Sequence, residues 1–242
     1  MKNAPIVCLS FLFALGACSS SSSTSSTSSQ KDRGLEGDGE EAAVAAPDTN
    51  PDGVPYPTTN LGTVARNGTR SGNRIANFKF LGYPDANPAN GLVPMSLAQF
   101  FDPEGKRYKL IHIQASGVWC TFCQQETEIV VPLASKFKEM KVVWLVSMAE
   151  GPTGGTPAKK SDLDGWIEEF NSPFPHVLDP GNANLGIFYD AAALPWNANI
   201  NAQTMEILQS GTGAHTTEKQ VLDELDGWIA QIDSGELSGD LK

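Results

Sequence analysis

Apolar residues along the chain recur with two different spacings, which together predict a β-sheet covered by helices. Short, nearly continuous apolar runs are typical of buried strands. We expect strands at 75–80, 109–115, 142–147, 174–178, 196–200 and 205–208. Apolar residues three and four positions apart are typical of amphipathic helices. We expect helices at 95–101, 120–140, 161–170, 183–189 and 217–232. This order predicts an α/β fold with a central mixed β-sheet and helices on both faces.

Two local features refine this pattern. Pro132 lies inside the predicted helix at 120–140 and should bend it, because proline has no backbone N–H to donate. The last two predicted strands are separated by the short segment 201–204, which predicts a turn and therefore a hairpin.

The first residues of the chain have the pattern of a secretory leader. Lys2 is followed by an apolar stretch at 6–14, which is too short to span a bilayer as a helix. The sequence LGAC at 15–18 resembles the bacterial lipobox, in which the cysteine is diacylated. This predicts a signal peptide at 1–17 and a lipid anchor on Cys18, since two or more acyl chains hold a protein stably on a membrane. The alternative is an ordinary cleaved signal peptide with a chance cysteine.

The next forty residues are too polar to form a core. Ser and Thr fill 19–29, acidic residues with Gly and Ala fill 31–46, and Pro is frequent at 47–57. Such segments bury too little apolar surface to offset the entropy lost on ordering. We therefore expect a lipidated, disordered Ser/Gly/Pro-rich tether at 18–60 and a folded domain at 61–242.

Charge and cysteine content narrow the function. The formal net charge is −11, so the chain gains nothing from releasing counterions on nucleic acid, and nucleic acid is not an expected partner. Of four cysteines, Cys8 lies in the leader and Cys18 in the lipobox. Cys120 and Cys123 remain in an exported chain, where conditions are oxidising.

The spacing of these two cysteines suits redox chemistry. A strand, the sequence WCTFC at 119–123 and then a helix place Cys120 at a helix N-terminus. Unpaired backbone N–H groups and the helix dipole there lower the pKa of a thiol from ~8.5 into the range ~3.5–7.5. Cys120 is therefore the expected nucleophile. Cys123 lies almost one turn deeper and can attack a mixed disulfide on Cys120 to release the partner.

Other uses of the pair fit less well. Covalent haem attachment needs a histidine directly after the second cysteine, where this chain has Gln124. Zinc needs four ligands, and a copper carrier would have a wider cysteine spacing. A peroxide-reducing enzyme would carry Pro and Thr ahead of its cysteine. A static disulfide remains the alternative, although so small a loop restrains the unfolded chain little. We expect His112 to be a hydrogen-bonded structural residue, and His176 and His215 to be solvent-exposed.

From 75 to 232 the chain resembles the thioredoxin superfamily, in particular the TlpA/ResA-like (AhpC/TSA-type redoxin) exported thiol–disulfide oxidoreductases. The resemblance rests on WCTFC at a strand–helix junction and on Leu194-Pro195 ahead of the predicted hairpin. It implies a thioredoxin-like fold with Pro195 in the cis form beside the disulfide. It also implies that the backbone of Leu194 pairs with substrate like a strand and that Trp119 is exposed beside the disulfide.

Two positions near the cysteine pair affect how its thiols could gain or lose protons. Glu126 follows Cys123 by three residues, where the ResA branch also has a glutamate. A carboxylate there could move protons or raise the pKa of a thiol by charge repulsion; the alternative is a solvent-exposed helix residue. Thioredoxin has an aspartate six residues before its first cysteine, whereas Gln114 at that position cannot titrate.

The resulting hypothesis is a membrane-anchored, extracytoplasmic thiol–disulfide oxidoreductase in which Cys120 attacks, Cys123 resolves and Pro195 orients the substrate. It needs no metal and no dissociable cofactor, because the electrons reside in the redox-active disulfide. The expected partners are a cysteine-containing client protein, a membrane redox partner and the lipid bilayer, which holds acylated Cys18. The expected location is the periplasm or the cell surface. The alternative is a non-catalytic thioredoxin-fold binding lipoprotein with a static disulfide.

Overall fold

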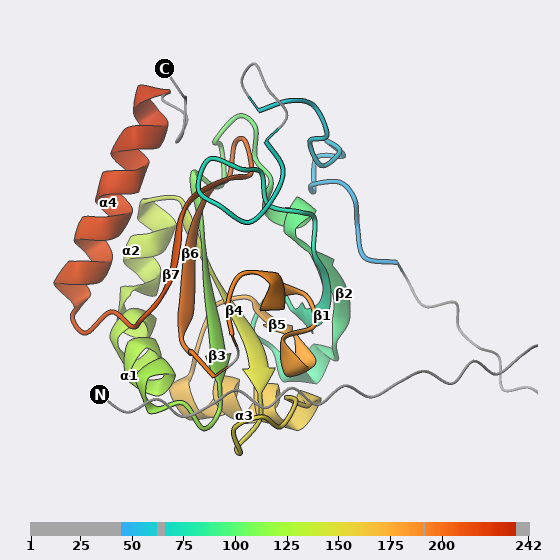
Figure 1. Ribbon diagram of the computed structural model, residues 1–242, viewed down its shortest axis with the longest axis vertical. Coiled ribbons are helices and arrows are strands. Elements are labelled where there is room, and N and C mark those ends of the chain that lie inside the picture. The colour runs from blue at the N-terminus through green and yellow to red at the C-terminus, as the bar shows by residue number, and fades with distance from the viewer. Residues whose placement is uncertain (1–44, 62–65, 191, 236–242) are drawn as a thin grey trace, which may run out of the picture. The chain divides into compact units, whose positions relative to one another are not determined.

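The computed structural model describes residues 45–61, 66–190 and 192–235. In this part of the chain seven strands form one sheet, in the order β2-β1-β5-β4-β3-β6-β7 (Figure 1). The strands are β1 (Lys79–Tyr83), β2 (Val93–Ser96), β3 (Leu110–Gly117), β4 (Val142–Glu150), β5 (His176–Leu178), β6 (Trp196–Asn201) and β7 (Glu206–Thr212).

The sheet is mixed, as predicted. β3, β4 and β5 are parallel neighbours, and the remaining pairs are antiparallel. Every residue of β3 and of β4 is buried. These two strands have helices or loops against both faces, which explains why their sequences are nearly continuous apolar runs rather than alternating ones.

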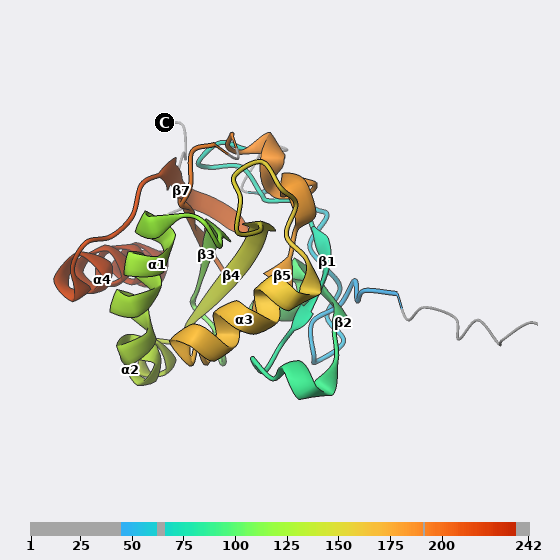
Figure 2. The same ribbon diagram turned by 90° about the horizontal axis from the view of Figure 1, so that it is seen from below.

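Helices cover both faces of this sheet. They are α1 (Thr121–Val130), α2 (Ala134–Glu139), α3 (Lys160–Phe170) and α4 (Glu218–Ser234). Figure 2 shows α1, α2 and α4 together on one side, with α3 apart from them near β5. The packing of the side chains is consistent with this arrangement. Val130, Phe137 and Leu225 pack with Trp144 of β4 in one apolar cluster. Trp166 of α3 belongs to a second cluster on the other face.

The predicted helix at 120–140 is interrupted at its proline. α1 ends at Val130, and Val131–Leu133 forms a 3-10 turn with Pro132 near its start before α2 begins. The bend predicted from Pro132 is confirmed.

Prediction was weaker at short elements. The strand expected at 75–80 forms four residues later, as β1, and β2 was not predicted. β2 has only four residues and contains Pro94, which is tolerated because the strand lies at the sheet edge. The helices expected at 95–101 and 183–189 are reduced to the 3-10 turns Leu97–Phe100 and Leu185–Ile187.

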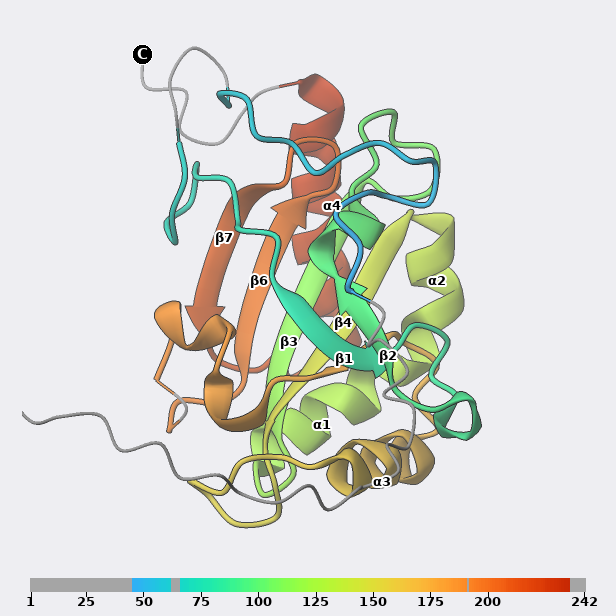
Figure 3. The same cartoon turned by 90° about the vertical axis from the view of Figure 1, so that its right-hand side faces the viewer.

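Part of the segment that we assigned to the tether, residues 45–60, packs against the domain. Asn50 is buried and donates from Nδ2 to the carbonyl of Phe101 at 3.0 Å. The hydroxyl of Ser96 donates to the carbonyl of Pro47. Figure 3 shows this segment in blue, running on to the end of β2. Residues before 61 therefore contact the domain that we expected at 61–242.

The predicted leader at 1–17, Cys18 and the tether up to residue 44 lie outside the described residues. Among the residues that are described, no helix has the length and apolar character needed to cross a membrane.

Candidate active site

The two cysteines are joined by a disulfide where β3 leads into α1. Cys120 is the N-cap residue of α1, and its Sγ accepts a hydrogen bond from the backbone N–H of Cys123 at 3.2 Å. The two Cα atoms are 5.2 Å apart. The structure thus places Cys120 at a helix N-terminus as predicted, with a donor aimed at its sulfur.

Two exposed aromatic residues adjoin the cysteines in the sequence. Cys120 is only 2% exposed and Cys123 is fully buried, whereas Trp119 is 37% and Phe122 62% exposed. The exposure predicted for Trp119 is confirmed. Phe122, between the two cysteines, adds apolar surface on which an extended polypeptide could dock.

Trp119 is held in place by a buried carboxylate. Its indole Nε1 donates to Oε2 of Glu150, the last residue of β4. The backbone N–H of Val118 donates to the carbonyl of Glu150 at 2.9 Å. Gly154 lies against the ring, since a Cβ there would be 3.5 Å from an indole carbon. Glu150 and the glycine-rich loop after it therefore fix the exposed ring of Trp119. The sequence analysis did not predict this role of Glu150.

The Leu194–Pro195 peptide bond is cis, as the resemblance implied. It precedes β6, whose first residue, Trp196, pairs with Ala115 of β3. A Cβ at Gly117, the last residue of β3, would lie 3.1 Å from a methyl carbon of Leu194. Leu194 and Pro195 are thus at the end of the sheet from which the cysteine loop emerges. The side chain of Leu194 is buried, so only its backbone could serve substrate pairing.

Glu126 is a buried residue, and the alternative of a solvent-exposed helix residue is wrong. It is 0% exposed. Its carboxylate accepts from Nδ2 of Asn197 at 2.9 and 3.1 Å and from the backbone N–H of His215 at 2.8 Å. Nδ1 of His215 lies 2.7 Å from Oε1. Glu126 follows Cys123 by three residues on α1, and side chains at that spacing share a helix face.

Glu126 belongs to a closed ring of hydrogen-bonded side chains between the sheet, α1 and α4. In order, the members of this polar ring are Glu126, His215, Glu224, Asn199, His112 and Asn197. Consecutive members are joined at 2.5–3.0 Å. Four elements and one loop contribute, so the ring ties α1 to the strand that follows the cis proline.

The pKa values of the two histidines in the polar ring are shifted in opposite directions. Burial would lower the pKa of His215, but hydrogen bonds and charge from Glu126 and Glu224 outweigh burial and raise this pKa to about 9. Burial, the largest single cause, raises the pKa of Glu224, but hydrogen bonds and charge from His215, together with His112 and Asn199, lower it, and the net direction is down. The pKa of His112 is lowered by burial and by the positive charge of His215.

Two histidine predictions were wrong and one is confirmed. His176 is fully buried, and the side chain of His215 is only 10% exposed, although both were expected at the surface. The cause is their partners: the Phe174 carbonyl bonds His176, and two carboxylates bond His215. His112 is a buried, hydrogen-bonded residue as expected, and it stacks on Trp144 with ring centroids 3.7 Å apart.

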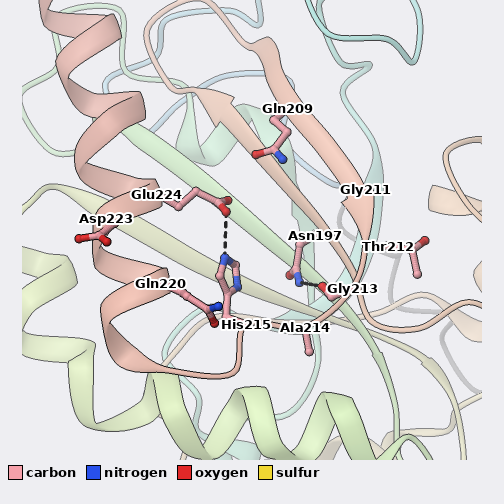
Figure 4. A pocket seen from close by; sticks show the side chains of 10 residues that line it. All are labelled: Asn197, Gln209, Gly211, Thr212, Gly213, Ala214, His215, Gln220, Asp223 and Glu224. Atoms are coloured by element: carbon pink, nitrogen blue, oxygen red, sulfur yellow. Dashed lines mark hydrogen bonds and ion pairs between the residues drawn. The ribbon is translucent and has the colours of Figure 1, made fainter.

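A polar cavity of about 430 Å³ opens beside the polar ring. Figure 4 shows His215 in its wall, with Glu224 on one side and Asn197 on the other. Gly211 and Thr212 at the end of β7, and Gly213 and Ala214 in the loop that follows it, also line the cavity. No group of three or more His, Cys, Asp or Glu side chains arranged to hold a metal ion occurs among the described residues.

Comparison with known proteins gives structural matches only. No family model matches the sequence, and no curated protein matches it. A Chlorobium tepidum protein assigned as thiol:disulfide interchange protein DsbE matches with a TM-score of 0.51 and 15% identity, over 67% of this chain and 99% of that one. A Bacteroides thetaiotaomicron protein assigned as a protein disulfide isomerase matches with a TM-score of 0.51 and 13% identity, over 69% and 92%.

A reduced 2-Cys peroxiredoxin from Plasmodium vivax matches with a TM-score of 0.52 and 14% identity, covering 68% of this chain and 99% of that one. The protein has a thioredoxin-like fold. At these identities the likeness establishes the fold, and the chemistry has to be argued from the residues.

In this thioredoxin-like fold Gln114 occupies the place where thioredoxin has an aspartate. Its Nε2 lies 3.3 Å from the carbonyl of Cys123 and 3.3 Å from the hydroxyl of Thr127, and its Oε1 accepts from Trp144 at 2.9 Å. This buried amide fastens α1 to β3 and β4 but carries no proton for exchange. The ionisable side chain on the same helix face as Cys123 is that of Glu126.

Two asparagines of the site had a signal in the sequence that we did not use. Asn197 and Asn199 alternate with the apolar residues of β6, which is the pattern of a strand with one polar face. Because all of β6 is buried, that polar face had to meet polar partners inside the molecule.

Proposed function

We propose that this protein is a thiol–disulfide oxidoreductase that acts outside the cytoplasm and is anchored to the membrane through acylated Cys18. The observation that carries this proposal is the Cys120–Cys123 disulfide with Cys120 as N-cap of α1. Support comes from the cis Leu194–Pro195 bond at the same end of the sheet.

The exchange uses the different positions of the two sulfurs. A client thiolate attacks Sγ of Cys120, the Cys120–Cys123 bond breaks, and its electron pair leaves with Sγ of Cys123. A second client thiolate then attacks the mixed disulfide and releases Cys120, so the client loses two electrons and the protein gains them. Cys120 is the better leaving group because the N–H of Cys123 and the start of α1 stabilise its thiolate.

Other residues act in recognition and proton transfer. Trp119 provides an apolar surface for the client, and the backbone of Leu194, fixed by Pro195, pairs with an extended client segment. Glu126 exchanges a proton with the buried sulfur of Cys123, one helical turn away.

The partners follow from this chemistry. They are a cysteine-containing client protein and a redox partner at the membrane that restores the working state of the pair. The electrons reside in the two sulfurs, so no dissociable cofactor is required. The predicted signal peptide and lipobox place the protein in the periplasm or on the cell surface.

A potential titration combined with cysteine variants tests the proposal. Equilibration of the full chain with glutathione should yield a measurable reduction potential above about −300 mV. Cys123→Ser should accumulate a mixed disulfide with oxidised glutathione, because the Cys120 thiolate attacks that disulfide and releases one glutathione, whereas Cys120→Ser should form none. A native disulfide that resists even excess dithiothreitol would contradict the proposal and favour a binding lipoprotein with a static bond.

A further inference from the structure

His215 connects a buried carboxylate near the disulfide to an open cavity. Its side chain is 10% exposed and lines that cavity (Figure 4). Its Nδ1 is 2.7 Å from Oε1 of Glu126, and its Nε2 is 3.0 Å from Oε2 of Glu224. Carboxylate oxygens accept hydrogen bonds, so both ring nitrogens donate and the ring is an imidazolium.

The buried sulfur of Cys123 needs a route by which a proton can reach it from solvent. Cys123 is 0% exposed, so its sulfur cannot take a proton directly from bulk water when the disulfide opens. A thiolate left in this apolar surrounding would be costly. Gln114, which bonds the Cys123 carbonyl, has no proton to give. Glu126 lies one turn along the same helix and is also fully buried.

We propose that His215 is a positioning residue that holds Glu126 beside Cys123 and passes to it the proton that Cys123 takes up on reduction. The cavity beside His215 is then the entrance for that proton. This inference rests on the thiol–disulfide exchange proposed above and adds the route between solvent and the buried sulfur.

The step balances as follows. When the client thiolate bonds Cys120, the electron pair of the broken S–S bond goes to Sγ of Cys123. That sulfur takes a proton from the carboxyl group of Glu126, which receives one from Nδ1 of His215. His215 regains its proton from water in the cavity. In the oxidising direction the same transfers run backwards, from Cys123 to solvent.

The charges around His215 determine when it can donate. Glu126 faces it from α1 and Glu224 from α4, while the His112 ring on β3 lies 5.9 Å away. Asp223 of α4 lines the same cavity, and the neighbours from β4 and β6 are uncharged. The carboxylates raise the pKa of His215 to about 9 despite its burial. The donating form is therefore present below that pH and lost above it.

The test is the pH profile of disulfide reduction in the full chain. Stopped-flow rates with excess dithiothreitol are measured between about pH 6 and pH 10. Each rate is divided by the rate at which the reagent reduces oxidised glutathione at that pH, which removes the titration of the reagent. The wild-type ratio should be flat at neutral pH and fall about 100-fold as His215 loses its proton, the low end for a positioned donor.

Variants decide whether His215 causes that fall. In His215→Gln the ratio should be about 100-fold lower at neutral pH and independent of pH. Glu224→Gln removes one of the two carboxylates that hold the proton, so the fall should move to lower pH. Asp226→Asn is the matched control, because it removes an exposed carboxylate of α4 that is not among the residues lining the cavity; it should behave like the wild type.

A fall that persists unchanged in His215→Gln would overturn the inference while leaving the exchange function intact. If His215→Gln does not fold, Glu224→Gln decides, because an unshifted fall there overturns the inference as well. A wild-type disulfide that dithiothreitol does not reduce at any pH would instead overturn the proposed function.

Discussion

Two buried histidines show how single residues take their charge from their neighbours. His176 and His215 are both withdrawn from solvent. Nδ1 of His176 lies 2.7 Å from the carbonyl oxygen of Phe174, and burial lowers the pKa of His176 to about 4. His215 lies between two carboxylates, and its pKa is raised to about 9. The same side chain is therefore neutral in one place and positively charged in the other.

We expect His176 to make the protein sensitive to acid. It is neutral when folded, but in the unfolded chain it takes up a proton near its ordinary pKa of 6.5. Its stabilising contribution is complete above that pH and is lost as pH falls toward about 4. The pKa difference corresponds to about 3 kcal/mol. Urea unfolding of wild type and His176→Asn at neutral pH and near pH 4.5 measures it. Equal losses of unfolding free energy in both proteins would contradict the assignment.

The candidate site was predictable where its residues are neighbours in the chain. The spacing of Cys120 and Cys123 is read directly from the sequence, and the exposure of Trp119 and the cis Leu194–Pro195 bond were implied by the family resemblance that these short motifs carry. The partners of Glu126 were not predictable in this way, because His215 is 89 positions away and meets it only after α4 packs beside α1. No periodicity within one element records such a contact.

At the scale of elements, long strands and helices with a regular apolar pattern were predicted correctly, whereas short elements without such a pattern were not. β3, β4 and α4 bury long repeated sets of apolar residues, so their positions follow from the sequence. β2 has four residues, one of them proline, and forms because β1 offers it an edge. Its existence depends on tertiary pairing rather than on its own propensity.

α2 is an element that depends on packing. With six residues it is too short to be stable alone. Phe137 fixes it to the sheet by stacking on Trp144, with ring centroids 5.2 Å apart, and on Phe174 at 5.9 Å.

We therefore expect Phe137→Ala to lower the free energy of unfolding by about 3–5 kcal/mol, because it empties a buried aromatic site. Lys138→Ala, at the next and exposed position, should change it by less than about 0.5 kcal/mol. Chemical denaturation of the two variants makes the comparison. A similar small effect from both would show that α2 does not depend on this stack.

At the scale of the whole molecule, the domain extends toward the N-terminus beyond the thioredoxin-like sheet. Besides Asn50, the segment before 61 contributes Tyr56, whose ring packs 6.3 Å from that of Phe101 and whose hydroxyl donates to the Ile75 carbonyl. Asp52 pairs with Arg107 at 2.7 Å. The composition of the segment before 61 is typical of a tether, because a few residues that contact the domain, placed among many polar ones, leave no periodic pattern.

These contacts predict that a chain beginning at Leu61 is less stable than one beginning at Ala45. The loss should be about 2–4 kcal/mol, the sum of the partly buried side chain of Tyr56 and one or two hydrogen bonds. Denaturation midpoints of the two chains measure it, and Val54→Ala in the longer chain is a control, because Val54 is exposed. Both chains should retain disulfide exchange, since the segment contacts the Phe101 and Ile75 region rather than Cys120. Equal stabilities would mean that residues 45–60 are part of the tether after all.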